Sequence, residues 1–289
     1  MTIDQLIKIL VTVTLFEMMV AIGLGVTIAD LVRVARDGRL VARAALANYV
    51  CVPAVTLGLL LLFDAHPMAA AGFLILGVCP GAPYGPPFAA LAKGNVAVAV
   101  GLMVLLAGSS ALVAPLLLHY LLPLMSDKEP LQADAAQIAT TLLVTQLLPL
   151  GVGVAVRQWR PRLAEWLQKP AGLVSKGLNL VTVGLILIAQ FDLLREIRLR
   201  AFVGMLVLLI ASWVAGWLLG GKDLATRKTM TLTTSLRNVG VGLVIATSTF
   251  ANTPAVTATL VYGLFEVVGS LLLALGWART ARATEAAFL

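Results

Sequence analysis

The feature that most constrains this sequence is a succession of nine long apolar stretches, which together occupy most of its 289 residues. A helix needs about 20 consecutive apolar residues to cross the hydrocarbon of a bilayer. The stretches are continuous rather than alternating, which excludes the short alternating strands of a transmembrane barrel. We therefore predict membrane-spanning helices at residues 8–29, 41–63, 67–90, 96–120, 136–156, 171–193, 201–220, 228–250 and 255–278.

The composition agrees with an integral membrane protein and leaves little room for anything else. Hydrophobic residues make up 60% of the chain and charged residues 12%, whereas a soluble domain is about 25% charged. The mean hydropathy is +0.98. The connections between stretches are too short to fold as a separate domain, so residues 1–289 are expected to form a single all-α polytopic domain.

The residues that usually build cofactor, metal or disulfide sites are scarce. Cys51 and Cys79 lie in apolar context, while His66 and His119 fall at predicted span ends. Neither a disulfide framework nor a metal site follows from this spacing, and no organic cofactor is expected. No metalloprotease or nucleophile motif is present, so an enzyme is not indicated. The N-terminus lacks a basic segment with a cleavage site, so we expect it to belong to the mature protein.

Basic residues are distributed unevenly between the two sides of the predicted topology. Fifteen of the 21 lysines and arginines fall on one side, and cytoplasmic connections carry such an excess. We therefore expect a multi-pass protein of the plasma membrane or bacterial inner membrane, with the N-terminus outside and the C-terminus in the cytoplasm. The cluster Arg195, Arg198 and Arg200 lies on the opposite side, with Asp192 and Glu196 nearby.

Two of the nine spans are interrupted. Residues 79–87 contain four prolines and two glycines, which cannot continue a helix because each proline removes a donor and clashes with the previous turn. In the eighth span, polar residues occupy much of 231–238 and glycines follow at 240 and 242. Non-helical backbone at membrane depth is tolerated only where protein buries it or where it lines a cavity.

The two interrupted spans are five apart, so they are predicted to cross the membrane in opposite directions. Paired broken helices in inverted repeats are typical of the midplane site of a secondary transporter. We therefore predict two inverted-topology repeats, about residues 8–120 and 136–278. Two independent kinks that only serve helix packing are the alternative.

Three ionisable residues are predicted to lie deep in the membrane, namely Glu17, Arg237 and Glu266. A charge there costs at least about 2.5 kcal/mol, and arginine stays protonated. Arg237 therefore needs a carboxylate, a dipole or an anion beside it, and we expect Glu266 or Glu17 to supply a carboxylate. The group is either a structural ion pair or a site where Arg237 receives an anionic substrate and Glu266 shapes the site or titrates.

The first interruption offers a second electrostatic element. The prolines at 86–87 suit the first turn of a half-helix, whose N-terminal N–H groups would favour an anion near the midplane. Tyr84 and Gly85 lie at that point and either contact a substrate or pack. Asn48 is the most notable of the other polar residues within spans, because Pro53 follows in an otherwise apolar helix.

Several short segments, taken in order, resemble the bile acid:sodium symporter family. The resemblance covers essentially the whole chain and is stronger in the first half. It implies a core with two crossing broken helices, a separate panel of helices, and alternating-access transport of organic anions with sodium. The segments are Gly23-Leu-Gly-Val-Thr27 with Asp30, Pro53, Cys79-Pro-Gly81, the stretch 91–97, Ala114-Pro-Leu-Leu117, Arg237-Asn238 and Gly269-Ser270.

The family pattern implies a set of sodium ligands that this sequence has largely lost. A Ser-Asn pair in the first break is matched by Gly85 and Pro86, and a Glu and a Gln in the second break by Thr233 and Arg237. Asn48 stands at the position of a Gln in the second span, and Ser110 is retained on the fourth. A sodium ion about 4 Å from a guanidinium would be repelled by about 4 kcal/mol at an effective dielectric constant of 20.

These observations predict a secondary transporter of a small or amphipathic organic anion in the lipid bilayer, with no nucleic-acid partner. Arg237 would replace a coupling cation, and Na⁺ or H⁺ remain the candidate coupling ions. A rearranged sodium site and a transport-inactive receptor or scaffold are the alternatives. The expected substrate-binding residues are Arg237, Asn238, Glu266, Tyr84, Gly85 and Asn48. The residues of the alternative sodium site are Thr233, Thr234, Ser110, Asn48 and Glu266.

Overall fold

The computed structural model describes residues 2–125, 131–195 and 199–287, and within these ranges every regular element is a helix. The elements are α1 (Ile3–Leu24), α2 (Ile28–Ala35), α3 (Gly38–Leu46), η1 (Ala47–Cys51), α4 (Val52–Leu62), α5 (Pro67–Gly77), α6 (Gly85–Leu91), α7 (Val96–Leu121), η2 (Leu122–Met125), α8 (Ala135–Leu142), η3 (Leu143–Leu147), α9 (Leu148–Trp159), α10 (Pro161–Ala189), α11 (Phe191–Arg195), α12 (Leu199–Leu219), α13 (Leu224–Ser235), α14 (Val239–Thr249) and α15 (Pro254–Ala287).

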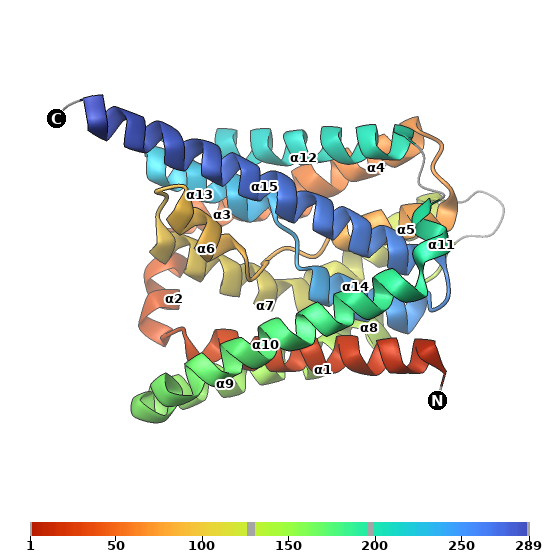
Figure 1. Cartoon of the computed structure of the whole chain (residues 1–289), viewed down its shortest axis with the longest axis horizontal. Helices are drawn as coiled ribbons and strands as arrows, with labels where there is room; N and C mark the ends of the chain where they lie inside the picture. The colour runs from red at the N-terminus through yellow and green to blue at the C-terminus, as the bar shows by residue number, and fades with distance from the viewer. Residues whose placement is uncertain (1, 126–130, 196–198, 288–289) are drawn as a thin grey trace.

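Seven helices in the described ranges are long and apolar enough to cross a bilayer, which confirms a polytopic membrane protein. The two interrupted helices, α5 with α6 and α13 with α14, fall outside this group because each is broken, so the total of nine crossings remains a prediction. Helix α1 begins at one end of the molecule and α15 finishes at the other (Figure 1). The seven are Gln5–Leu24, Gly38–Leu62, Val96–Met125, Ala135–Trp159, Pro161–Ala189, Leu199–Leu219 and Pro254–Thr280.

Helices α1, α9 and α10 form one layer, which lies along the lower edge of Figure 1 beneath the other long helices. Glycines let α1 and α9 approach until their backbones touch. A Cβ atom at Gly23 would lie 2.5 Å from Leu150 O, and one at Gly153 would lie 2.4 Å from Val20 O. Because lipid is as apolar as a leucine side chain, such close packing of small residues is a main source of helix association in membranes.

Two boundaries differ from the sequence prediction near the ends of this layer. The first span was predicted to continue to residue 29, but α1 ends at Leu24 and a new helix starts at Ile28. Thr27 caps that helix because its hydroxyl accepts a hydrogen bond from Asp30 N, and the Asp30 carboxylate accepts one from Thr27 N. This reciprocal capping box stabilises a helix start. Helix α10 starts at Pro161, well before the predicted start at 171.

The two interruptions are shorter than the sequence indicates. Helix α6 starts at Gly85 with its prolines in the first turn, as the sequence predicts. Helix α13 continues to Ser235, so the threonines at 231–234 are helical and only Leu236–Asn238 separates it from α14. Consecutive threonines are compatible with this helix because Thr231 and Thr233 each return a hydrogen bond to a carbonyl four residues earlier.

The two interruptions cross and are hydrogen-bonded to each other. Asn238 N donates to Cys79 O at 2.7 Å, and Asn238 Nδ2 donates to Gly81 O at 3.2 Å. The same side chain accepts a bond from Val241 N and so caps α14. Gly81 has a φ of +89°, and a Cβ atom there would lie 2.4 Å from Ala107 N on α7. Only glycine fits this point.

Candidate functional site

The guanidinium of Arg237 lies beside the crossing, in a cage of oxygen atoms. Its Nε donates to Leu76 O at 3.3 Å, and Nη2 donates to Gly77 O. Nη1 donates to Asn48 Oδ1 at 2.7 Å and to Thr234 O at 3.5 Å, and Nη2 also donates to Asn48 O at 3.3 Å. The side chain is 1% exposed. Every donor group of the guanidinium is therefore directed at protein oxygen atoms.

Local structure explains why these oxygen atoms are available. Leu76 and Gly77 end α5, where the last carbonyls of a helix have no intrahelical partner and carry partial negative charge. In the π-helix η1, Val52 N bonds to Ala47 O, five residues back. The corresponding partner of Asn48 O would be the nitrogen of Pro53, which has no hydrogen. The bulge thus leaves Asn48 O free to accept from Arg237.

Glu266 contacts Arg237 through the backbone rather than through the guanidinium. Its Oε1 accepts a hydrogen bond from Arg237 N at 2.6 Å, and the residue is fully buried on α15. Within the described ranges the one ion pair is Arg157–Glu165. Of the partners that the sequence left open, dipoles surround the guanidinium, supplied by backbone carbonyls and Asn48, while Glu266 lies beside Arg237 without forming an ion pair with the guanidinium. Oε2 of Glu266 has no hydrogen-bond partner among the described residues.

Glu17 is not part of this group. It lies partly buried on α1, where its carboxylate accepts a hydrogen bond from Ser175 on α10. The prediction that Glu17 could partner Arg237 is wrong, because α1 turns this carboxylate toward α10. Glu17 and Ser175 instead join the two long helices of the α1–α9–α10 layer.

The hydroxyl residues proposed for a rearranged sodium site are mostly engaged elsewhere. Thr233 Oγ1 bonds to Thr229 O at 2.9 Å, within its own helix. Ser110 Oγ donates to Ala107 O at 2.7 Å. Thr234 Oγ1 is buried and has no partner among the described residues. Of the five predicted ligands, Thr234 and Glu266 each keep an oxygen without a partner, and Asn48 Oδ1 accepts from Arg237.

Tyr84 and Gly85 lie at the start of α6 but face different neighbours. Gly85 is buried, and a Cβ atom there would lie 3.3 Å from Thr233 Cγ2. The hydroxyl of Tyr84 accepts a hydrogen bond from Asn179 Nδ2 at 2.7 Å. Asn179 belongs to α10, so this bond joins the crossing to the α1–α9–α10 layer.

Gln146 is a buried polar residue that sequence reasoning missed. It lies in the π-helix η3, and its Nε2 donates to Ala107 O and to Ser110 Oγ, the latter at 3.2 Å. Pro149 follows in the next turn, as Pro53 follows Asn48. The shared pattern of an amide residue shortly before a proline was the available signal. Asn179 and Ser175 carried no comparable signal.

Two broken helices that cross inside a polytopic helical bundle, with buried charge at the crossing, define the class of secondary membrane transporters. The family model described as Sodium Bile acid symporter family matches residues 12–200. This chain therefore belongs to the sodium bile acid symporter family.

Three curated relatives align with nearly the whole chain. The uncharacterized sodium-dependent transporter YocS of Bacillus subtilis (strain 168) is 24% identical over 286 residues, which cover 95% of this chain and 85% of the relative. The probable sodium/metabolite cotransporter BASS1, chloroplastic, of Arabidopsis thaliana is 24% identical, with coverages of 91% and 65%. The corresponding BASS2 protein of Oryza sativa subsp. japonica is 26% identical, with coverages of 93% and 64%.

The chain thus spans most of the bacterial relative and slightly under two thirds of each chloroplastic relative. The family and these relatives are transporters and not enzymes. They confirm the resemblance seen in the sequence and the assignment to membrane transport.

Proposed function

We propose that this protein is a secondary transporter of a small or amphipathic organic anion that works by alternating access, and in which Arg237 permanently replaces a coupling cation. The observation that carries the proposal is the oxygen cage around the guanidinium. It is built from the carbonyls of Leu76, Gly77 and Asn48 and from the Asn48 side chain. Carbonyl and amide oxygens at the end of a half-helix are the ligands that transporters of this type offer to a cation.

A guanidinium and a sodium ion would compete for this cage. Two unit charges about 4 Å apart repel by about 4 kcal/mol at an effective dielectric constant of 20. The buried hydroxyl of Thr234 would not offset that repulsion, because a neutral hydrogen-bonding group contributes about 1 kcal/mol. The proposal therefore includes the loss of ordinary sodium coupling.

Glu266 is the group that we propose for coupling to protons. Oε1 is held by Arg237 N, while Oε2 is buried without a partner among the described residues. An ionisable residue inside the membrane is by default a candidate functional residue. The anion would bind next to this pair, with Asn238, Gly85, Tyr84 and Asn48 as the neighbouring contacts.

Sodium coupling through a rearranged site is the second candidate, and two observations favour it. Thr234 Oγ1 and Glu266 Oε2 are both buried and unpartnered within the described ranges. The three relatives are also named as sodium-dependent transporters or sodium/metabolite cotransporters.

The experiment that separates the two candidates is a thermal melt of the purified protein, with sodium exchanged for choline at constant ionic strength. A bound ion at 100 times its dissociation constant stabilises the folded state by about 2.7 kcal/mol. We expect the wild-type melting temperature to be the same in both salts. A sodium-specific rise in the wild type would overturn the role proposed for Arg237.

The substitution Arg237→Gln sharpens this experiment. It leaves Gly77 O and Asn48 O without a charged donor, and the resemblance places a glutamine at this position. We therefore expect the melting temperature of Arg237→Gln to rise in sodium but not in choline. Arg39→Gln, which alters an exposed arginine on α3, is the matched control and should respond like the wild type.

A further inference from the structure

A cavity of about 900 Å³ lies apart from the crossing, between α4, α5, α12 and α15. It is found at the end of the molecule where α1 begins, near the start of α5 and α11 (Figure 1). None of the residues that hold Arg237 lines it. The role proposed for Arg237 therefore does not account for this space, and a ligand in this space is independent of that role.

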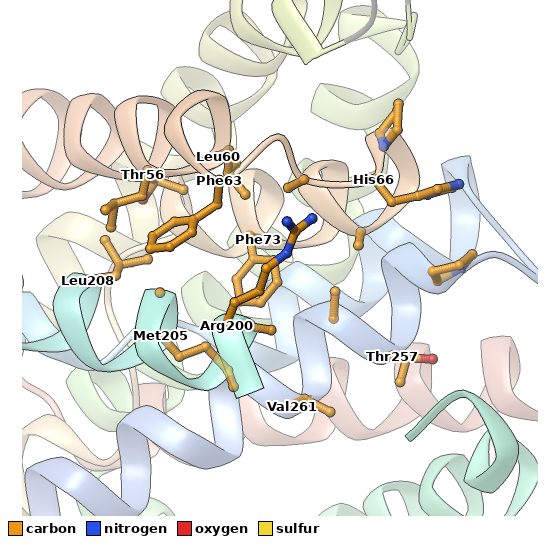
Figure 2. A pocket seen from close by; sticks show the side chains of 18 of the residues that line it. Thr56, Leu60, Phe63, His66, Phe73, Arg200, Met205, Leu208, Thr257 and Val261 are labelled. Carbon is orange, nitrogen blue, oxygen red and sulfur yellow. The ribbon is translucent and has the colours of Figure 1, made fainter. Parts of the chain in front are cut away.

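The walls of the cavity are apolar. Leu60 and Phe63 come from α4 and its end, Phe73 comes from α5, and Met205 and Leu208 come from α12 (Figure 2). The volume falls within the range of about 300–1,000 Å³ that is typical of small-molecule sites. An apolar space of this kind favours an apolar ligand, because water inside it would lack hydrogen-bond partners.

Charged groups of both signs lie at the mouth of this space. Arg200 and Asp64 are exposed and line it, together with His66. Figure 2 shows Arg200 projecting from the start of α12 toward the chain that carries His66. Arg200 Nη2 donates one long hydrogen bond, to Asp64 O at 3.4 Å. Its guanidinium forms no ion pair within the described parts of the chain.

The mouth also lies where spanning helices end. Helix α4 ends at Leu62 and α5 starts at Pro67, while α12 and α15 start at Leu199 and Pro254. The ends of membrane-spanning helices lie at the level of the lipid headgroups. The charged mouth is therefore at headgroup level and the apolar walls are at the level of the acyl chains.

We propose that this cavity is a binding site for a zwitterionic phospholipid whose headgroup carries a primary amine. An acyl chain fills the apolar space, the phosphate pairs with Arg200, and the ammonium pairs with Asp64. A guanidinium presents two parallel donors to a phosphate. The carboxylate of Asp64 favours a headgroup that also carries a positive charge over one that is only anionic.

The test uses the purified full-length protein after removal of native lipid. Dioleoyl phosphatidylethanolamine and dioleoyl phosphatidylglycerol share the same acyl chains and differ in headgroup, so their retention is compared by native mass spectrometry and by melting temperature. We expect the wild type to retain the ethanolamine lipid in preference and to melt at a higher temperature with it. Equal retention of both lipids would overturn the proposed selectivity.

Three variants assign the binding to this cavity. Arg200→Ala should weaken retention of both lipids at least about tenfold, because it removes the charge-assisted pair. Asp64→Asn should abolish only the preference for the ethanolamine lipid. Asparagine suits the position because the backbone there has a φ of +45°. Gly204→Leu should block the cavity, since a Cβ atom at Gly204 meets the Phe63 ring at an ordinary 3.7 Å.

The matched control is Arg195→Ala. Arg195 lies over the Phe191 ring at 4.4 Å and does not line the cavity, so this variant should bind both lipids as the wild type does. Unchanged retention by Arg200→Ala or by Gly204→Leu would overturn the proposal. Stabilisation by a long-chain carboxylate without retention of either phospholipid would do the same.

Discussion

At the scale of single residues, the guanidinium of Arg237 is a buried charge that is costly to remove from water. Several kcal/mol are needed to remove a charge from water, and this cost is offset only when the surrounding groups satisfy it. Here the end of α5 and the π-helix around Asn48 supply carbonyl oxygens, and the Glu266 side chain accepts a hydrogen bond from the backbone of the same arginine. The buried oxygen atoms therefore need the guanidinium as a hydrogen-bond donor, and the guanidinium needs them as acceptors.

This dependence predicts a large loss of stability in Arg237→Met. The substitution keeps a long side chain but leaves the carbonyls of Gly77 and Asn48 and the Glu266 carboxylate without the cation. We expect the free energy of unfolding to fall by about 3–5 kcal/mol, measured by denaturant melts in detergent.

A double variant tests the origin of that loss. Adding Glu266→Gln to Arg237→Met replaces the buried carboxyl group that the single variant leaves without the guanidinium nearby. The double variant should therefore lose less stability than the sum of the two single losses. Strict additivity would contradict an electrostatic link between the two residues. Arg39→Met, on the exposed surface of α3, should change stability by less than about 0.5 kcal/mol.

Sequence reasoning identified the residue at the centre of this site and two of its neighbours, Asn48 and Glu266, but not the backbone carbonyls around it. A charged residue within an apolar stretch is visible in the sequence, and so is Asn48 five residues before Pro53. The carbonyl groups of Leu76 and Gly77 are not visible, because every residue has one and only the end of a helix makes it available. For this reason the sequence left a carboxylate, a dipole and an anion open as partners of Arg237, and could not say that backbone dipoles surround its guanidinium.

At the scale of elements, Asn238 fixes how the two broken helices cross. Its oxygen caps α14, its amide nitrogen reaches Gly81 O, and its backbone nitrogen reaches Cys79 O. One side chain thus stabilises a helix start and holds the opposite break in place.

Two substitutions at this position separate the two roles. Asn238→Asp keeps an oxygen for the cap but loses the donor to Gly81 O, whereas Asn238→Ala loses both. A cap and a neutral hydrogen bond each contribute about 1 kcal/mol, so Asn238→Ala should lower the melting temperature more than Asn238→Asp does. The reverse order would show that the added charge, and not the lost bond, controls stability at the crossing.

The bond between Tyr84 and Asn179 joins α6 to α10 and so connects the crossing with the α1–α9–α10 layer. Tyr84→Phe and Asn179→Ala should each destabilise the protein modestly. Their double variant should show a coupling energy of about 0.5–1.5 kcal/mol in melts. A coupling near zero would indicate that the two helices are held together by apolar packing alone.

The helix boundaries show where sequence patterns were sufficient to predict the start or end of a helix. The prolines at 86–87 placed the start of α6 correctly because proline is favoured in the first turn of a helix. The polar run at 231–235 was taken for a break, but those residues form the end of α13. Threonine hydroxyls can bond to the preceding turn of a helix, so polarity alone does not end one.

At the scale of the whole molecule, the two termini of the helical bundle lie at opposite ends (Figure 1). This arrangement agrees with an odd number of crossings, as the predicted nine would give. On the predicted topology, α7 ends on the side of the membrane where α1 begins. The connection between α12 and α13 lies at the other end.

The distribution of basic residues predicts which end faces the cytoplasm. Single cysteines at Gln132 and at Lys222, both exposed, can be placed in a background that carries Cys51→Ala. Cys79 is fully buried and should stay unreactive. We expect an impermeant maleimide to label the Gln132→Cys variant in intact cells and the Lys222→Cys variant only after permeabilisation. The opposite result would place the N-terminus in the cytoplasm and overturn the use of the positive-inside rule here. Labelling of both sites in intact cells would contradict the odd number of crossings predicted between residues 132 and 222.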